Sequence, residues 1–261
     1  MVNFGKLTRS NLRQFFILTI FWRHYLSKQH KNKMKKLIIF SGSGISAESG
    51  ISTFRDSGGL WEQYRIEDVA TPRAWKNNPA MVQEFYNLRR KQIMECEPNN
   101  AHVLIAQLES NYEVTVITQN IDDLHERAGS TNVLHLHGNI RQSKSSGPNK
   151  EKAYYPIDGW ELQMTDLCPD GYVLRPHVVW FEEEVPMYEV AMQQIAEADI
   201  LIVIGTSLQV YPAAGLINYA INAETRYLID PNAEELNVPS SFRVIAKNAV
   251  EGMTELLQEL G

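Results

Sequence analysis

The sequence predicts an α/β fold: a Rossmann-like, doubly wound parallel sheet with a smaller inserted module. Three observations support this. From Met34 onward, short runs rich in Val and Ile alternate with helical patterns, a glycine-rich junction follows the first run, and two stretches of other composition interrupt the alternation. A chain of 261 residues suits one large α/β domain with an insert better than two full domains.

Six short apolar runs are expected to be strands buried on both faces, as in a parallel sheet. They cover residues 37–40, 114–118, 133–136, 200–204, 227–229 and 244–246. Helical spacing of apolar residues occupies residues 100–110, 185–198, 213–223 and 250–260. This alternation is typical of doubly wound folds.

Two stretches break the alternation and are expected to form the smaller module over the carboxyl edge of the sheet. Residues 62–98 read as mostly helical, with Pro72 and Pro79 as breaks, and residues 141–174 read as a polar, irregular insert. The predicted organisation is a basic N-terminal extension over residues 1–33 and a main domain over residues 34–261, which includes the smaller module.

The N-terminal extension differs in charge from the rest of the chain. Residues 1–36 hold nine of the 25 Lys and Arg and no acidic residue, which leaves 16 basic against 31 acidic residues elsewhere, a net charge of −15. Such an acidic body makes nucleic acid a poor candidate partner. The apolar run at residues 15–22 is too short to span a bilayer, so a membrane role is not expected. The extension is interpreted as an early start before Met34, an appendage or, least favoured, an anchor.

Cysteine usage points to a reducing compartment. Cys96 and Cys168 are the two cysteines, far apart in the chain. They allow no disulfide framework and no four-thiolate zinc cage, and they fit a cytoplasmic protein.

The junction after the first predicted strand matches a phosphate-binding loop. Gly42, Gly44 and Ala47 satisfy the pattern G-x-G-x-x-A directly after residues 37–40. The glycines permit a tight turn and close approach of a pyrophosphate, and the alanine permits close packing of the next helix. A tight strand-to-helix turn without a ligand is the simpler alternative.

A second strand-to-helix junction favours a dinucleotide over a mononucleotide. Gly205, Thr206 and Ser207 follow residues 200–204, and Asp230 ends the next strand, where its carboxylate can accept hydrogen bonds from an adenosine ribose. In a dehydrogenase the acidic residue follows the first loop by about twenty residues, so hydride transfer is not indicated.

Polar side chains also follow the second and third predicted strands. Gln119, Asn120 and Asp122 come after residues 114–118, and His137 comes at the end of residues 133–136 beside Gly138. Open α/β sheets place their ligands at this edge. His125 and His135 are interpreted as structural, and His137 as the candidate general base, because its ordinary pKa is near neutrality.

At this point the sequence resembles the sirtuin family. The matching motifs are GSGISAESGI at 42–51 with Phe54-Arg55 and Gly59-Leu60-Trp61, QNID at 119–122 with Leu124-His125, LHG at 136–138, LRP at 174–176 with VVWF at 178–181, and GTSL at 205–208 with Val210 and Pro212. They occur in the family's order and span residues 34–260.

The resemblance implies an NAD-dependent protein-lysine deacylase. In that family the acyl oxygen of the lysine displaces nicotinamide, and a histidine then deprotonates a ribose hydroxyl, giving free lysine and O-acyl-ADP-ribose. His137, Asn120 and Asp122 take the catalytic roles. The implied cofactor contacts are Gly42, Ser43, Gly44, Glu48, Phe54, Arg55, Trp61, Gln119, Asn120, Ile121, Asp122, Gly205, Thr206, Ser207, Asp230 and Ala249, and Val179 and Phe181 would contact the acylated protein.

The acyl group is expected to carry a carboxylate. Tyr86 and Arg89 lie three residues apart on one face of a predicted helix, and sirtuins that remove succinyl and malonyl groups carry this Tyr-x-x-Arg pair. A guanidinium can pair with both carboxylate oxygens. A core tyrosine beside a solvated arginine is the structural alternative.

Three departures from the family stand out. Most sirtuins hold a structural zinc with four cysteines, whereas residues 139–174 contain only Cys168, so no zinc is expected and Tyr154, Tyr155, Trp160 and Leu162 are expected to pack in its place. Ser43 replaces the usual alanine. Glu182 replaces the usual glycine in the strand expected to pair with substrate, and its charge leaves the order of acyl preference open.

Other functions remain compatible with the motifs: a protein ADP-ribosyltransferase, an NAD hydrolase, or an NAD-sensing module without catalysis. Tyr86 and Arg89 argue against the first two, since neither needs a pocket for an acyl carboxylate. A sensing module would not need Asn120, Asp122 and His137 together.

Overall fold

The computed structural model describes residues 34–51, 64–236 and 238–260. The chain divides into two compact units, Met1–Lys35 and Lys36–Gly261, and the description below concerns the second. The predicted N-terminal extension lies outside the described residues, as do three predicted cofactor contacts, Phe54, Arg55 and Trp61.

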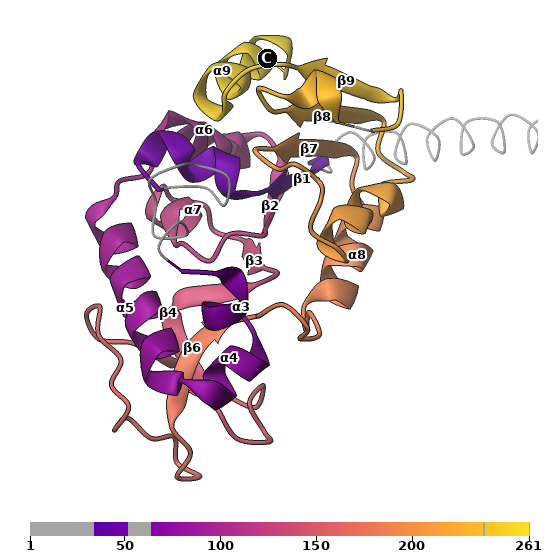
Figure 1. The fold of residues 1–261 in the computed structure, drawn as a ribbon. Coiled ribbons are helices and arrows are strands. Elements are labelled where there is room, and N and C mark those ends of the chain that lie inside the picture. The colour runs from indigo at the N-terminus through magenta and orange to yellow at the C-terminus, as the bar shows by residue number, and fades with distance from the viewer. Residues whose placement is uncertain (1–33, 52–63, 237, 261) are drawn as a thin grey trace, which may run out of the picture. The chain divides into compact units, whose positions relative to one another are not determined.

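A six-stranded parallel sheet forms the large part of the second unit (Figure 1). Its order is β3-β2-β1-β7-β8-β9. The strands are β1 (Lys36–Ser41), β2 (Glu113–Thr118), β3 (Val133–His135), β7 (Ile200–Ile204), β8 (Thr225–Ile229) and β9 (Phe242–Ile245). The order reverses between β1 and β7, as in dinucleotide-binding folds, and ligands bind at that switch point. The predicted α/β, Rossmann-like fold is confirmed.

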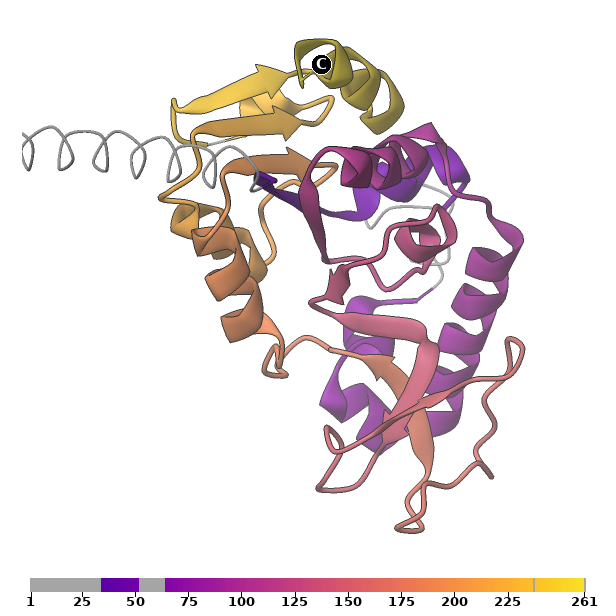
Figure 2. The same cartoon turned by 180° about the vertical axis from the view of Figure 1, so that it is seen from behind.

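Alternate residues of the central strands feed two separate cores. Ile38 and Phe40 of β1 join the cluster that contains Ala191 and Ile195, whereas Leu37 and Ile39 join the opposite cluster. Helices therefore cover both faces, with α8 on one and α6 and α9 on the other (Figures 1 and 2). The helical elements of this part are η1 (Ser43–Ser49), α6 (Asn100–Gln107), η2 (Leu108–Ser110), α7 (Leu124–Arg127), α8 (Tyr188–Ala196), η3 (Ala213–Tyr219), η4 (Ala233–Glu235) and α9 (Ala249–Leu260).

Two helix predictions were wrong in kind. The segment expected to be a helix over residues 213–223 is the 3-10 helix η3, and the turn after the first glycine loop is the 3-10 helix η1. A 3-10 helix winds more tightly than an α-helix and seldom exceeds about four residues, so these two, of seven residues each, are long for their kind.

The smaller part packs three helices against a three-stranded antiparallel sheet of order β5-β4-β6. The elements are α3 (Ile66–Val69), α4 (Pro72–Asn77), α5 (Pro79–Glu95), β4 (Gly138–Ser145), β5 (Tyr154–Pro156) and β6 (Leu174–Val178). Pro72 and Pro79 are the first residues of α4 and α5, where the missing N–H is tolerated. Residues 141–174, expected to be irregular, contribute to all three strands of this sheet.

Candidate active site

The loops after β1 and β7 lie against each other at the switch point of the sheet. The Gly42 amide donates to the Ile204 carbonyl (3.1 Å), and the Gly44 amide donates to the Gly205 carbonyl (2.8 Å). A Cβ on Gly44 would lie 2.8 Å from the Gly205 Cα, and Gly205 itself has a φ of +61°. The glycines are therefore needed first for contact between the loops. The sequence analysis assigned them to a tight turn and to the approach of a pyrophosphate, and did not anticipate the contact between the loops.

The loop after β2 joins the same edge. The Gln119 amide donates to the Ser41 carbonyl (2.9 Å), and its side-chain Nε2 donates to Thr206 Oγ1 (3.0 Å). Gln119 thus ties the loops after β1, β2 and β7 together. Its side chain and Thr206 were both predicted to contact the cofactor, and the structure brings them into direct contact.

Asn120 and Asp122 share a partner that sequence reasoning missed. Asn120 Nδ2 donates to Ser46 Oγ (3.1 Å), and the Ser46 hydroxyl donates to Asp122 Oδ2 (3.1 Å). All three side chains are buried. Burial raises the pKa of Asp122, while the Leu124 amide and the Ser46 hydroxyl oppose that shift. Ser46 lies within the first loop motif, but nothing in the sequence indicates that its side chain contacts Asn120 and Asp122.

His137 faces the same loop from the end of β3. Its Nδ1 lies 3.0 Å from the Gln119 carbonyl oxygen. A carbonyl accepts hydrogen bonds, so Nδ1 carries the proton and Nε2 keeps its lone pair. Burial lowers the pKa of His137, and the Gln119 carbonyl only partly offsets this. A histidine that is neutral at pH 7 with an available Nε2 can serve as a general base.

The other two histidines near this edge have polar partners. His125 Nε2 lies 3.0 Å from Ser41 Oγ, and the ring packs edge-on against His102. His135 contacts the Asn120 carbonyl and the Glu126 carboxylate. Glu126 Oε1 lies 2.8 Å from the Nε2 of His135.

Tyr86 and Arg89 lie on the buried face of α5, in the smaller part. Tyr86 is 2% exposed and Arg89 6%. Burial raises the pKa of Tyr86 above its ordinary range. Burial also lowers the pKa of Arg89, and among the charges that oppose this shift the Asp122 carboxylate has the largest effect. Tyr86 therefore packs in the apolar cluster of the smaller part, and Arg89 lies within electrostatic range of Asp122.

Trp180 forms part of the surroundings of Tyr86. The ring centroids of Tyr86 and Trp180 are 6.4 Å apart. The Arg175 guanidinium stacks on the Trp180 ring, 3.6 Å from its centroid. Arg175 and the Trp180 amide both donate to Glu183 Oε2 (2.7 and 3.0 Å). The sequence motif contained Arg175 and Trp180 without indicating this arrangement.

The residues predicted to contact substrate lie just beyond β6. The Val179 amide donates to the His137 carbonyl (2.9 Å), and the Phe181 amide donates to the Ala70 carbonyl (3.0 Å). Glu182 is not in a strand, contrary to prediction. It lies in a turn with a φ of +71°, the left-handed region that glycine adopts most readily.

The other residues predicted to contact the cofactor lie in the turn after β8, in η1, at the start of α9 and in the loops after β1, β2 and β7. Asp230 Oδ1 accepts from the Asn232 amide (2.9 Å) in the turn after β8. Glu48 Oε2 accepts from the Val250 amide (3.0 Å), next to the buried Ala249 at the start of α9. Glu48 thus has a structural partner of its own. Ser43, Ile121 and Ser207 are partly exposed.

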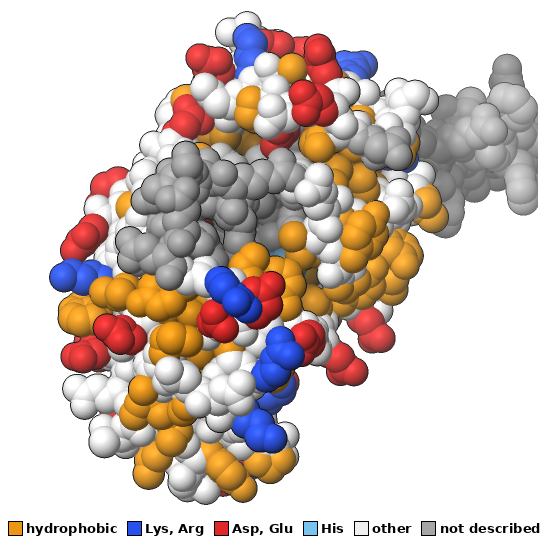
Figure 3. All heavy atoms as spheres, in the orientation of Figure 1, with side chains coloured by type: hydrophobic (Ala, Val, Ile, Leu, Met, Phe, Trp, Pro, Cys, Tyr) orange, Lys and Arg blue, Asp and Glu red, His pale blue; other side chains and the backbone are white. Residues whose placement is uncertain are grey.

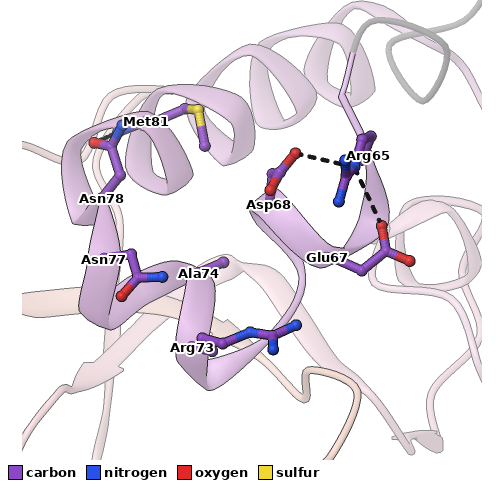
Figure 4. Close-up of a pocket in the computed structure, with 8 residues that line it drawn as sticks. All are labelled: Arg65, Glu67, Asp68, Arg73, Ala74, Asn77, Asn78 and Met81. Carbon is purple, nitrogen blue, oxygen red and sulfur yellow. Dashed lines mark hydrogen bonds and ion pairs between the residues drawn. The ribbon is translucent and has the colours of Figure 1, made fainter.

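A hollow on the smaller part lies apart from these residues. Arg65, Glu67, Asp68, Arg73, Ala74, Asn77, Asn78 and Met81 line it (Figure 4). Arg65 is placed between Glu67 and Asp68, at 3.7 and 3.4 Å. None of the predicted site residues lines it, so it is not a candidate for the reaction.

The fold and the paired loops define a nucleotide-binding α/β protein with a histidine at the sheet edge. The chain belongs to the Sir2 family, whose model matches residues 42–212. It is 50% identical over 231 residues to an NAD-dependent protein deacylase of Bacteroides thetaiotaomicron, which covers 87% of this chain and 98% of that protein. A deacylase of Pyrococcus furiosus is 44% identical, with 87% and 92% covered.

Solved structures of the family share the fold. A Sir2 homologue bound to ADP-ribose superposes with a TM-score of 0.78 at 36% identity, covering 87% of this chain and 92% of that one. A Sir2 homologue–NAD complex gives a TM-score of 0.75 at 37% identity, with 87% and 90% covered.

Proposed function

We propose that this protein is an NAD-dependent protein-lysine deacylase that releases nicotinamide and O-acyl-ADP-ribose. The observation that carries the proposal is the placement of His137: it lies half-buried at the sheet edge, with Nδ1 on the Gln119 carbonyl and with no partner on Nε2 among the described residues, so that this nitrogen can take a proton. Membership of the family and relatives named as deacylases support it.

NAD fits the edge of the sheet as a substrate. The loops after β1 and β7 are in contact at the switch point, where the order of strands reverses and dinucleotides bind. The Gly42–Gly44 and Gly205–Ser207 backbones are proposed to hold the pyrophosphate, and Asp230 the adenosine ribose. Gln119, Asn120, Ile121 and Asp122 are proposed to hold the nicotinamide ribose. The proposed contacts Ser43, Glu48, Ala249, Phe54, Arg55 and Trp61 complete the set.

The residues at this edge can bear the proposed reaction. The acyl oxygen of the lysine attacks the nicotinamide ribose as nicotinamide leaves. His137 Nε2 then takes the proton of a ribose hydroxyl, which attacks the acyl carbon. Asn120 and Asp122, fixed through Ser46, orient the ribose and a water. The lowered pKa of His137 keeps it neutral at pH 7, as a base requires.

Replacing His137 tests this assignment. His137→Ala is expected to keep NAD binding, since within the described part of the chain the ring hydrogen-bonds to the Gln119 backbone alone. Deacylation should fall about 10²–10⁴-fold, the usual contribution of general base catalysis. Titration calorimetry with NAD and a peptide assay measure the two effects. Turnover close to wild type would remove His137 from the mechanism.

The acyl group is proposed to carry a carboxylate, as in succinyl- and malonyl-lysine. Tyr86 and Arg89 support this because both are buried and lie on one face of α5. A carboxylate entering an apolar tunnel needs a charged partner, and the guanidinium offers two parallel donors. Acetyl-lysine lacks this group and gains nothing from Arg89.

Arg89→Met should lower kcat/KM for succinyl and malonyl peptides at least tenfold, since a charged hydrogen bond contributes about 1.5–3 kcal/mol. Acetyl turnover should hardly change. Arg90→Met is the matched control. Arg90 is also buried, but its Nε and Nη1 donate to the Ile140 and Trp160 carbonyls (2.6 and 2.7 Å), so its loss should affect stability and all acyl groups alike. Equal losses for Arg89→Met would assign it a structural role.

The smaller part is proposed to fold without zinc. Within the described residues no group of three or more His, Cys, Asp or Glu side chains is placed to hold a metal ion. The Cys168 thiol instead donates to Ser145 Oγ (3.4 Å), and that oxygen also accepts from the Gly147 amide (3.0 Å). These bonds link the end of β4 to the loop before β6.

Packing around this module is mixed rather than the aromatic core expected from sequence. Leu162 is buried, but Tyr154 and Trp160 are 40% and 38% exposed. Metal analysis of the purified protein should find clearly less than one zinc per chain, and a chelator should leave the unfolding temperature unchanged. A stoichiometric zinc that resists dialysis would overturn the proposal.

The partner is proposed to be an acylated protein that approaches Val179 and Phe181. Glu182 and Glu184 are exposed beside them and favour lysines with basic neighbours.

Among the helices of the described residues, none is both long and apolar enough to cross a membrane. The face drawn in Figure 3 carries Lys, Arg, Asp and Glu side chains intermixed.

A further inference from the structure

Two histidines, two residues apart, hold successive carbonyls of one loop. His137 Nδ1 lies 3.0 Å from the Gln119 carbonyl oxygen, and His135 Nδ1 lies 3.0 Å from the Asn120 carbonyl oxygen. Because a carbonyl only accepts, Nδ1 carries a proton in both rings. The two histidines therefore differ only in what their Nε2 atoms meet.

The Nε2 of His135 meets a carboxylate. It lies 2.8 Å from Glu126 Oε1, and this carboxylate of α7 can only accept while ionised. Both ring nitrogens of His135 then donate, which requires the imidazolium form. The side chains of His135 and Glu126 are 11% and 38% exposed, so the ring is largely shielded from water while the carboxylate is partly open to it.

We infer that His135 is a positioning residue: held as an imidazolium by Glu126, it fixes the loop of Gln119–Asp122 for the reaction proposed above. The inference rests on that proposed function. One loop is thus held by a neutral histidine that serves as the base and by a charged histidine that does not touch substrate.

Charged and titratable groups face His135 from several elements. Glu126 and His125 lie on α7, Asp122 on the loop, and His177 on β6. Burial lowers the pKa of His135, but the hydrogen bond and charge of Glu126, the Asn120 carbonyl and Asp122 together raise it above 6.5. The His135 cation in turn opposes the burial of Asp122 and helps keep that carboxylate ionised.

Asn139 of β4 gives the ring a partner for its neutral form. Its Nδ2 lies 3.3 Å from His135 Nε2, and its Oδ1 accepts from the Arg141 amide (2.8 Å), which fixes the orientation of the amide. When His135 loses its proton, Nε2 can accept from Asn139 and the bond to Glu126 is lost. The Gln119–Asp122 loop is then held by a neutral imidazole in place of the imidazolium.

The two histidines therefore predict opposite limbs of a bell-shaped pH profile. The acid limb reports protonation of His137, whose pKa is lowered, and the alkaline limb reports loss of the His135 proton, whose pKa is raised. Activity is highest between the two, where His137 is neutral and His135 is charged.

Two nearly isosteric variants should move the His135 pKa in opposite directions. Glu126→Gln removes the anion and should bring it below the wild-type value, whereas Asn139→Asp adds one and should raise it. Titration of the imidazole C–H signals by NMR in the full chain measures both shifts, with His135→Gln identifying the signal. The alkaline limb of kcat should shift with the NMR midpoint, and His135→Gln should abolish that limb and lower kcat about tenfold.

The results separate this inference from the proposed function. A wild-type His135 midpoint at or below 6.5, or one that Glu126→Gln leaves unchanged, overturns the imidazolium. A midpoint that shifts while the alkaline limb stays in place, or a limb that persists in His135→Gln, shows a purely structural histidine and overturns the positioning role. An absence of all deacylation would refute the proposed function while the NMR titration still tests the ion pair.

Discussion

The large sheet and the smaller part bury their interiors in different ways. The clusters on the two faces of the sheet consist of apolar side chains, most of them aliphatic. Buried Arg and Lys side chains among the described residues all belong to the smaller part: Arg89, Arg90, Lys144 and Arg175. Each such charge needs a partner, because an isolated buried ion is very costly. The sheet therefore depends on apolar area, and the smaller part on polar pairing.

This difference matches the two proposed tasks, the reaction at the sheet edge and acyl recognition in the smaller part. The loops that meet at the sheet edge rest on a rigid apolar base, which suits a fixed reaction geometry. The smaller part holds cations beside the buried Tyr86, which is consistent with the proposed recognition of a charged acyl group. Three experiments test the contrast, in order of decreasing effect.

Breaking the buried ion pair should have the largest effect. Arg175 and Glu183 side chains are 4% and 5% exposed, and their Nη2 and Oε2 atoms lie 2.7 Å apart. Pairing with Arg175 lowers the pKa of Glu183 to about 2 despite burial, so the pair is ionised at pH 7. Glu183→Gln leaves the guanidinium uncompensated and should lower the free energy of unfolding by about 3–5 kcal/mol.

Glu255→Gln is the matched control for this experiment. Glu255 pairs with Lys247 at 2.6 Å, but the two side chains are 42% and 46% exposed. Exposed pairs contribute at most about 1 kcal/mol. Urea unfolding at pH 7 measures both variants. Equal losses would show that the smaller part does not depend on its buried charges.

Acid should weaken the sheet region through His102. This histidine is fully buried, and burial lowers its pKa from 6.5 to about 4. The unfolded chain therefore binds a proton between pH 6.5 and 4 that the folded chain does not, so stability falls as the pH decreases through this range. The loss at pH 4 is about 3 kcal/mol from this group. Urea unfolding from pH 7 to 4 should show it, and His102→Gln should reduce the slope. An unchanged slope would assign the acid sensitivity elsewhere.

The smallest effect concerns backbone strain beside β6. Gly205 at the sheet edge adopts a positive φ as a glycine, whereas Glu182 adopts a φ of +71° with a side chain. A non-glycine residue in the left-handed region costs about 1 kcal/mol or more. Glu182→Gly should therefore stabilise the fold by about 1 kcal/mol in thermal unfolding. Glu184→Gly, two residues on without a positive φ, should destabilise it, and a loss in both variants would contradict the strain at Glu182.

The sheet could be predicted from sequence because its signal is local. Each buried strand is a short aliphatic run, and residues 200–204 match β7 at both ends. The interior of the smaller part has no such period. Lys144 lies in a polar stretch that reads as a loop, yet its side chain is 1% exposed and pairs with Glu151 at 2.8 Å. A buried charge cannot be distinguished from a solvated one until its partner is known.

The same limit applies to the candidate site. His137 and the Gln119–Asp122 loop could be predicted because they follow strands directly. Ser46 bonds to residues 74 and 76 positions away, and His135 bonds to Glu126 across the turn from α7 to β3. Such contacts depend on how the loops meet at the sheet edge, which no spacing in the sequence specifies.

The balance of products tests the central claim most directly. The purified protein is incubated with NAD and a succinylated peptide, and nicotinamide, O-succinyl-ADP-ribose and free lysine are quantified by mass spectrometry. The account predicts one of each per turnover, with none formed by His137→Ala above about a hundredth of the wild-type rate. Release of nicotinamide without free lysine would contradict it, with the ADP-ribose found in solution or attached to protein.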